Sequence, residues 1–176
     1  MDEVTLTAPP VIASAFPAQS QLAAWRETAT FHDTFEVALS EPGLTPIEIF
    51  QRASRATPGW AARLMAIRNR AVRLAGLKDV GALAERVDRP AADYRVGDQL
   101  GIFTLLASTD DEIVLGIDDH HLDVRVSVLK FVRDGAPRYA FSTLVRTHNL
   151  LGRLYMIPVG RIHPVIVRAL MRGARV

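Results

Sequence analysis

The chain of 176 residues is long enough for one domain with a full apolar core, and its composition, 49% hydrophobic and 23% charged, is typical of globular proteins. Its 21 basic and 19 acidic residues nearly balance, and the arginines are scattered among the acids, which argues against a nucleic-acid-binding surface. The absence of cysteine excludes disulfides, thiol nucleophiles and cysteine-based metal sites.

The N-terminus and the hydropathy pattern predict a cytoplasmic protein. The first residues, MDEVTLTAPP, carry acids where a secretory signal needs a basic region. No continuous run of apolar residues approaches the ~18–20 that are needed to span a bilayer. We therefore expect no integral membrane segment.

The chain begins with a stretch rich in alanine, proline and serine, residues 1–25, which is typical of an extended, loosely packed N-terminal extension. The remainder, residues 26–176, is expected to form a single domain. Its first element is a strand over residues 31–39, because phenylalanine, valine and leucine share one parity while polar residues fall between them.

Two helices are expected after this strand. Thr45-Pro46-Ile47-Glu48 is a capping box with proline at the first helical position, so the threonine and glutamate side chains satisfy free backbone amides. A second Thr-Pro pair at Thr57 starts the next helix, and Gly76 is placed to end it. That helix carries apolar residues at the helical period: Trp60, Leu64, Ile67, Ala71 and Leu74.

A run of strands is expected in the second half of the chain. Residues 78–97 have no clear period, apart from one short helix over 80–87, and beyond them the apolar period changes to two. The predicted strands are Ile102–Ser108, Glu112–Ile117, His121–Val132 and Arg138–His148. Short turns join them, with Asp134-Gly135 a typical hairpin turn. Such joints require antiparallel neighbours, because a parallel crossover needs many more residues.

The end of the chain predicts a last strand over Gly152–Val159 and then a closing helix, GRIHPVIVRALMRGARV, with one apolar side. An antiparallel sheet with an apolar face needs a cover, and this helix is the natural one. We therefore predict an α+β fold: a curved antiparallel sheet of about six or seven strands packs on a C-terminal helix, with a helix pair after the first strand.

This element order resembles the helix-grip fold of the START and Bet v 1-like superfamily, which implies a cavity between the sheet and the last helix. The local sequence also resembles the family known as domain of unknown function 2867. The segments that carry this resemblance are Gly116–Val128, Ser142–Tyr155, Ile162–Leu170 and the helical stretch Pro58–Leu77. Together they cover most of residues 31–172, and the resemblance implies no established activity.

The densest polar cluster in the sequence is DDHHLDVR, residues 118–125. Strand parity places His121, Asp123 and Arg125 on one face, with Asp119 extending the row. A histidine flanked by carboxylates suits general-base chemistry, and aspartate with histidine can hold a metal. The alternative is a turn followed by the solvent face of the sheet. If the polar row lies at a cavity mouth, Asp123 and Arg125 are expected to pair there.

Two other histidines, His148 and His163, are expected near one end of the sheet, where they either approach each other or bridge backbone groups. No HxH or HExxH spacing, GxSxG elbow or phosphate-binding glycine loop occurs, so the sequence predicts no metal and no cofactor. Tyr139, Tyr155 and Trp60 either line a ligand pocket or belong to the plain core.

These patterns predict a protein that binds a small apolar molecule between the sheet and the C-terminal helix. The ligand-binding candidates are Asp119, Arg125, Tyr139, Tyr155, His163 and Trp60. The first alternative is a cyclase- or dehydratase-type enzyme that uses the same cavity, with His121, Asp123 and His148 as catalytic groups. The second is a structural protein that self-associates through exposed sheet, for example as a homodimer.

Overall fold

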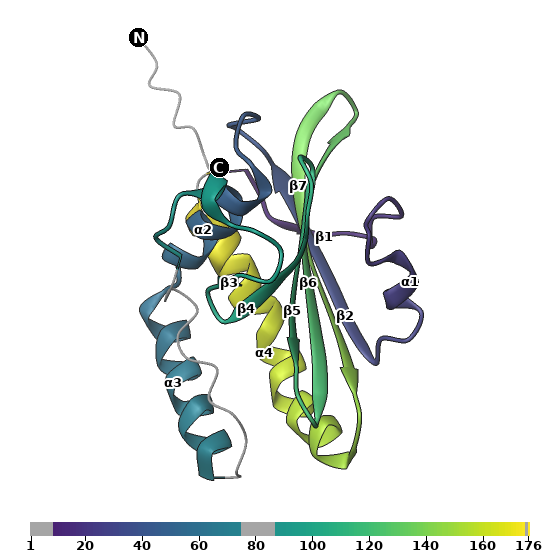
Figure 1. Ribbon diagram of the computed structural model, residues 1–176, viewed down its shortest axis with the longest axis vertical. Helices are drawn as coiled ribbons and strands as arrows, with labels where there is room; N and C mark the ends of the chain where they lie inside the picture. Colours follow the sequence, from purple (N-terminus) through teal and green to yellow (C-terminus); the bar gives the residue numbers. More distant parts are fainter. Residues whose placement is uncertain (1–8, 75–86, 175) are drawn as a thin grey trace.

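One antiparallel sheet organises the chain, of which the computed structural model describes residues 9–74, 87–174 and 176. Its strand order is β1-β2-β7-β6-β5-β4-β3. The strands are β1 (Ile12–Ala13), β2 (Phe31–Ala38), β3 (Gln99–Leu100), β4 (Phe103–Ser108), β5 (Glu112–Asp118), β6 (Leu122–Arg133) and β7 (Ala136–Thr147). The helices are α1 (Ala23–Arg26), α2 (Pro46–Arg55), α3 (Gly59–Leu74), the 3₁₀ turn η1 (Ala91–Asp93) and α4 (Leu150–Ala174). Figure 1 shows α2, α3 and α4 on one side of the sheet and α1 on the other.

The predicted fold class is confirmed, as is each main strand to within two residues at either end. The turn between β6 and β7 uses Asp134 and Gly135, with φ of 53° and 75°, as a two-residue hairpin of the primed type requires. The first long strand, β2, pairs with the last, β7, with Phe35 opposite Phe141. This long-range pairing places the two ends of the domain side by side at the centre of the fold.

The sheet face toward α2 and α4, here called the inner face, holds the main core. Alternate residues of β2, β5, β6 and β7 point into it, as the period of two predicted. The buried members from these strands are Phe35, Val37, Ile113, Leu115, Val126, Val128, Tyr139 and Phe141. Phe50 of α2 completes this packing, because its ring stacks on Phe141 and meets Phe103 edge-on.

The start of α2 confirms the predicted capping box. The Glu48 backbone N–H donates to the Thr45 hydroxyl (3.3 Å), and the Thr45 N–H donates to the Glu48 carboxylate (2.7 Å). The short helix that results lies over β5 and β6 and against α4. A local sequence pattern therefore places the helix that closes one end of the core.

The predicted strand over Gly152–Val159 is wrong, because these residues are the first turns of α4. Asn149 caps the helix: its side-chain oxygen accepts from the Gly152 N–H (3.0 Å). Pro158 and Pro164 lie inside the helix, where proline is unfavourable, and Pro158 falls in the part that was predicted as a strand. The predicted closing helix, which contains Pro164, forms the rest of α4. The helix contacts β2, β7 and α2.

Helix α4 carries apolar residues on two opposite sides. By length and composition it could cross a membrane, with a mean hydropathy of 1.2 in its most apolar window, 17% of which is buried. The core helix of a soluble protein can meet the same criterion, and Val167, Leu170, Met171 and Ala174 are packed into the core here. The stripe on the opposite side is exposed and consists of Leu150, Leu151, Leu154, Ile157, Ile162 and Val165.

Helix α3 is present where the periodicity predicted it, but the described side chains of its apolar stripe, Trp60, Leu64 and Ile67, are not packed into the core. Trp60 and Leu64 are exposed, and Ile67 is 65% exposed. The predicted cap at Gly76 and the short helix over 80–87 lie outside the described residues, apart from Val87, which belongs to the core. An amphipathic pattern identified this helix without identifying what its apolar side faces.

The N-terminal segment packs on the other side of the sheet, here called the outer face. Ile12 and Ala13 pair with β2 as β1, and Leu22 is buried against Val114 and Leu144 in a second, smaller core. The described part of the predicted loose extension is therefore ordered against the sheet. It explains why several outward-pointing positions of this sheet are apolar.

Burial of Tyr139 on β7 predicts an alkaline limit to stability. Burial raises the pKa of the Tyr139 phenol above its ordinary value, and the hydroxyl lies 3.5 Å from the Met171 carbonyl. The unfolded chain loses this proton above about pH 10 while the folded chain retains it, so the free energy of unfolding falls as pH rises past that point. Phenylalanine has no phenol to ionise, so we expect Tyr139→Phe to lack this part of the alkaline loss of stability.

Urea unfolding at about pH 8 and about pH 11 measures the effect on wild type and Tyr139→Phe. At the lower pH the two should differ by about 1 kcal/mol or less, because the deleted hydrogen bond is long. At the higher pH the variant should retain more of its stability than wild type does. Equal losses in the two proteins would contradict the expectation.

Candidate functional site

The turn between β5 and β6, residues Asp118–His121, carries the centre of the polar cluster. The His148 backbone N–H donates to the His121 carbonyl (3.0 Å), and the Asn149 side-chain amide donates to the His120 carbonyl (3.1 Å). The Asp119 N–H donates to the Leu122 carbonyl and closes the turn. These bonds hold the turn at the end of the sheet where α4 begins.

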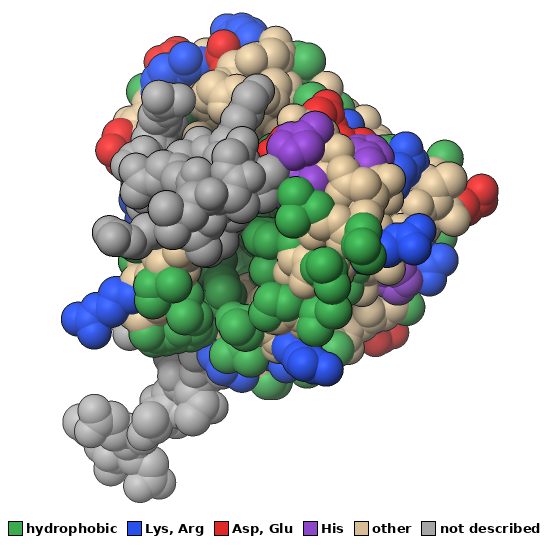
Figure 2. All heavy atoms as spheres, turned by 90° about the horizontal axis from the view of Figure 1, so that it is seen from below, with side chains coloured by type: hydrophobic (Ala, Val, Ile, Leu, Met, Phe, Trp, Pro, Cys, Tyr) green, Lys and Arg blue, Asp and Glu red, His purple; other side chains and the backbone are tan. Residues whose placement is uncertain are grey.

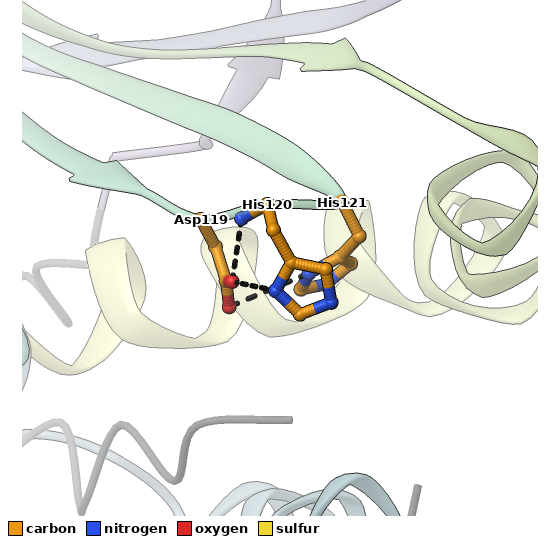
Figure 3. A group of neighbouring side chains, drawn as sticks. All are labelled: Asp119, His120 and His121. Atoms are coloured by element: carbon orange, nitrogen blue, oxygen red, sulfur yellow. Dashed lines mark hydrogen bonds and ion pairs between the residues drawn. The ribbon is translucent and has the colours of Figure 1, made fainter. Parts of the chain in front are cut away.

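The side chains of Asp119, His120 and His121 converge below this turn, as Figure 3 shows. One carboxylate oxygen of Asp119 lies 2.6 Å from His120 Nδ1 and accepts the His120 backbone N–H at 2.6 Å. The other lies 3.4 Å from His121 Nδ1. The three possible ligand atoms all lie within 4.8 Å of one another. We refer to these three residues as the Asp-His-His cluster.

The three side chains of the Asp-His-His cluster differ in their exposure. The imidazole of His121 is 2% exposed and packs edge-on against Tyr155 of α4, with ring centroids 5.7 Å apart, whereas the imidazole of His120 is 58% exposed. The prediction that His121 shares a face with Asp123 is wrong, because β6 begins only at Leu122. His121 belongs to the turn and points toward α4 instead.

Asp119 is held in its charged form. Burial acts to raise the pKa of its carboxyl, but the backbone N–H of His120 and the two imidazoles outweigh burial, so the pKa lies below the ordinary value. At neutral pH the cluster therefore offers one carboxylate between two imidazoles. That donor set suits a divalent transition metal or a proton relay.

Asp123 and Arg125 lie on the outer face, away from α4, and do not pair with each other. Asp123 lies 3.0 Å from His148 Nε2, and Arg125 donates to Asp118 at 2.6 Å. The guanidinium of Arg125 also lies over the ring of Trp25 from the N-terminal segment. These two predicted site residues therefore pair with neighbours on the far side of the sheet from the C-terminal helix.

His148 and His163 do not meet, since each pairs with a different carboxylate. His163 on α4 approaches Asp33 on β2, with 2.7 Å between His163 Nδ1 and Asp33 Oδ2. Sequence reasoning missed Asp33. It has the parity of Phe31 and Phe35, so it is an acid in an inward-facing position, and that pattern would have identified it.

Of the three aromatic candidates, Tyr139 contacts α4, Tyr155 belongs to α4 and Trp60 belongs to α3. Tyr139 is fully buried in the main core, and Tyr155 packs on His121. Trp60 is exposed near the start of α3. The structure therefore brings Tyr155 to the Asp-His-His cluster, assigns Tyr139 to packing and leaves Trp60 at the surface.

Apolar side chains gather on the face of the molecule seen from its lower end in Figure 1. Figure 2 shows them around a depression, with histidine and acidic side chains at the edge of the apolar area. On the inner face at this end, Ile117 and Val124 are paired neighbours and only half-buried, while Leu115 and Val126, one step further along, are buried. Ile102 and Ile166 are likewise half-buried at the margin of the core. We call the half-buried apolar margin formed by these four residues, Ile102, Ile117, Val124 and Ile166, the hollow.

Comparison with protein families gives one match. A family model described as "Protein of unknown function (DUF2867)" matches residues 25–170, which is most of the chain and includes the Asp-His-His cluster. No curated protein matches the chain. The family resemblance predicted from the sequence is confirmed. The family's description states no activity, so a function has to be argued from the geometry.

Proposed function

The chain belongs to this family of unknown function, and on that premise we propose that it binds a small apolar molecule in the hollow beside α4. The observation that carries the proposal is the half-exposed apolar pair Ile117 and Val124, which lies next to the buried pair Leu115 and Val126 on the inner face. Helix α2 covers the far end of this face, where Phe50 meets Phe103 and Phe141, and not the end that carries the pair.

The energetics favour an apolar occupant of the hollow. Removing apolar surface from water contributes about 25 cal/mol per Å². A ligand that covers the half-exposed apolar side chains of the hollow therefore gains binding free energy from their burial. The apolar residues of α3, Trp60, Leu64 and Ile67, add further uncovered apolar surface on the same side of the sheet. Pockets for small molecules are typically lined in this way, with a few polar groups at one end.

A second depression, of about 370 Å³, is less suited to such a ligand. Its lining includes Asp88, Arg89, Tyr94 and Gln99, and the Arg89 guanidinium lies over the Tyr94 ring. Charged and amide groups would lose hydration under an apolar molecule without gaining partners. The hollow is therefore the site that we assign to the ligand.

Two of the three predicted catalytic groups of the enzyme alternative lie away from the hollow, whereas the third, His121, points toward α4. Asp123 and His148 pair with each other on the outer face, and a ligand in the hollow would be separated from them by the sheet. Self-association through the exposed stripe of α4 is the competing use of an apolar surface. Light scattering after size-exclusion chromatography tests self-association, which predicts a mass above that of the monomer that rises with protein concentration.

Binding is tested with an apolar fluorescent probe, N-phenyl-1-naphthylamine, on wild type and on Ile117→Trp. We expect saturable binding to wild type, and about tenfold weaker binding to the variant because its indole fills the hollow. Val132→Trp is the matched control, since Val132 is 71% exposed and lies beside the β6–β7 hairpin turn at the other end of the sheet. Native mass spectrometry of the purified protein checks for a co-purified ligand.

Three results would count against the proposal. One is a lack of saturable probe binding together with no co-purified molecule. Another is equal affinity in wild type and Ile117→Trp when both are folded. The third is equal weakening in Ile117→Trp and Val132→Trp, which would point to a general effect of added aromatic surface. Thermal unfolding of each variant shows that loss of fold is not the cause.

A further inference from the structure

We propose that Asp119, His120 and His121 bind one divalent transition-metal ion of the zinc type. The sequence predicted no metal because no familiar spacing of histidines occurs. Such spacings describe ligands on helices and strands, whereas here three consecutive residues converge because a tight turn presents them. The inference does not depend on an apolar ligand in the hollow.

The distances in the Asp-His-His cluster are close to those of a metal site. Zinc binds imidazole nitrogen and carboxylate oxygen at about 2.0–2.2 Å, so ligand atoms around a tetrahedral ion lie about 3.3–3.5 Å apart. Asp119 Oδ2 and His121 Nδ1 are 3.4 Å apart. His120 Nδ1 lies 2.6 Å from the other carboxylate oxygen, Oδ1, and its exposed side chain has to turn toward an ion bound at Oδ2. All three ligand atoms lie within 4.8 Å of one another.

The neighbouring elements preorganise the cluster. The backbone of the turn is tied to the end of β7 and to the residue that caps α4, through the bonds from His148 and Asn149. Tyr155 packs against the His121 ring and restricts its orientation. Asp119 Oδ1 accepts the His120 backbone N–H and so leaves Oδ2 in position for an ion. Supports of this kind decide whether a set of potential ligands holds a metal tightly.

The protein supplies three ligands, which leaves one tetrahedral position open. Structural zinc sites are closed by four protein ligands, whereas sites that act on a bound molecule keep a position for water or substrate. The exposure of His120 gives this position access to solvent. Two imidazoles and a carboxylate favour zinc, cobalt or nickel over magnesium and calcium, which prefer oxygen ligands.

The test is titration of the tag-free full chain, after removal of metal with a chelator, with Zn²⁺ in a calorimeter. We expect one ion per chain with a dissociation constant of about 10 µM or lower. His120→Ala should weaken binding at least about tenfold, because it removes one of three ligands while its exposed position spares the fold. Asp119→Asn and His121→Ala should weaken it as well, with circular dichroism checking that each variant folds.

His32→Ala is the matched control, because His32 is an exposed imidazole on β2. It should bind Zn²⁺ as wild type does. Titration with Co²⁺ adds an independent readout, since the visible absorption of cobalt reports four-coordinate nitrogen and oxygen ligation. The proposal is overturned by binding weaker than about 1 mM, by unchanged affinity in His120→Ala, or by an equal loss in His32→Ala.

Discussion

Replacing Gly152 with alanine is expected to lower the free energy of unfolding by about 2–4 kcal/mol. A Cβ atom at this position would lie 2.1 Å from the His121 carbonyl oxygen, far inside contact distance, and 3.3 Å from Thr147 Cβ. The obstacle is backbone that is itself hydrogen bonded to His148, so it cannot move aside at low cost. Alanine is the better helix former by about 1 kcal/mol, and this gain offsets only part of the strain.

Chemical denaturation measures this effect, with Gly59→Ala as the control. Gly59 is also a helical glycine, but a Cβ there meets nothing within 4 Å. Gly59→Ala should therefore leave stability unchanged or raise it by up to about 1 kcal/mol. If Gly152→Ala were as stable as Gly59→Ala, the close approach of α4 to the β5–β6 turn would be refuted.

Replacing Glu112 with alanine is expected to cost about 2–4 kcal/mol and to release the N-terminal segment from the outer face. The Glu112 carboxylate is buried and accepts from the hydroxyls of Ser20 and Ser127, both at 2.5 Å, and from the Gln21 backbone N–H at 2.8 Å. Its removal leaves the Gln21 N–H and two hydroxyls without their acceptor in a buried place. The segment 9–30 should then become sensitive to limited proteolysis under native conditions.

Two variants control for the loss of charge and of side-chain volume at Glu112. Glu112→Gln keeps the shape and one acceptor oxygen, so it should cost about 1 kcal/mol. Glu27→Ala removes an exposed carboxylate next to α1 and should change stability by less than about 0.5 kcal/mol. A Glu112→Ala protein whose N-terminal segment is cleaved no faster than that of wild type would show that the carboxylate does not hold the segment in place.

Most of the fold could be predicted because its elements follow local rules. The capping box at Thr45 specified the start of α2, and the Asp134-Gly135 turn joined two strands of matching parity. The first turns of α4 could not be predicted in the same way. Gly152–Val159 was predicted as a strand, and Pro158 argues against a helix there, yet the Asn149 cap and contacts with β2 and β7 stabilise it.

The candidate site was predicted only in part, for a geometric reason. Parity on a strand placed Asp123 and Arg125 on the face opposite Val124 but left open whether that face lines a cavity or meets solvent. Parity does not apply to His121, which lies in the turn. The ion pairs of Asp33 with His163 and of Asp123 with His148 join residues more than twenty positions apart. No local pattern contains such pairs.

The sequence by itself determined the main strands, the helix pair and the antiparallel pairing of strands joined by short turns, because periodicity, caps and short turns act within a few residues. It did not determine the first turns of α4 or the pairing of β2 with β7. Only the tertiary structure decided which sheet face each polar residue occupies and what covers that face. The N-terminal segment packs against the outer face, and α4 packs against the inner face beside β2 and β7. The hollow and the convergence of Asp119, His120 and His121 follow from this packing arrangement, because both depend on how separate elements pack.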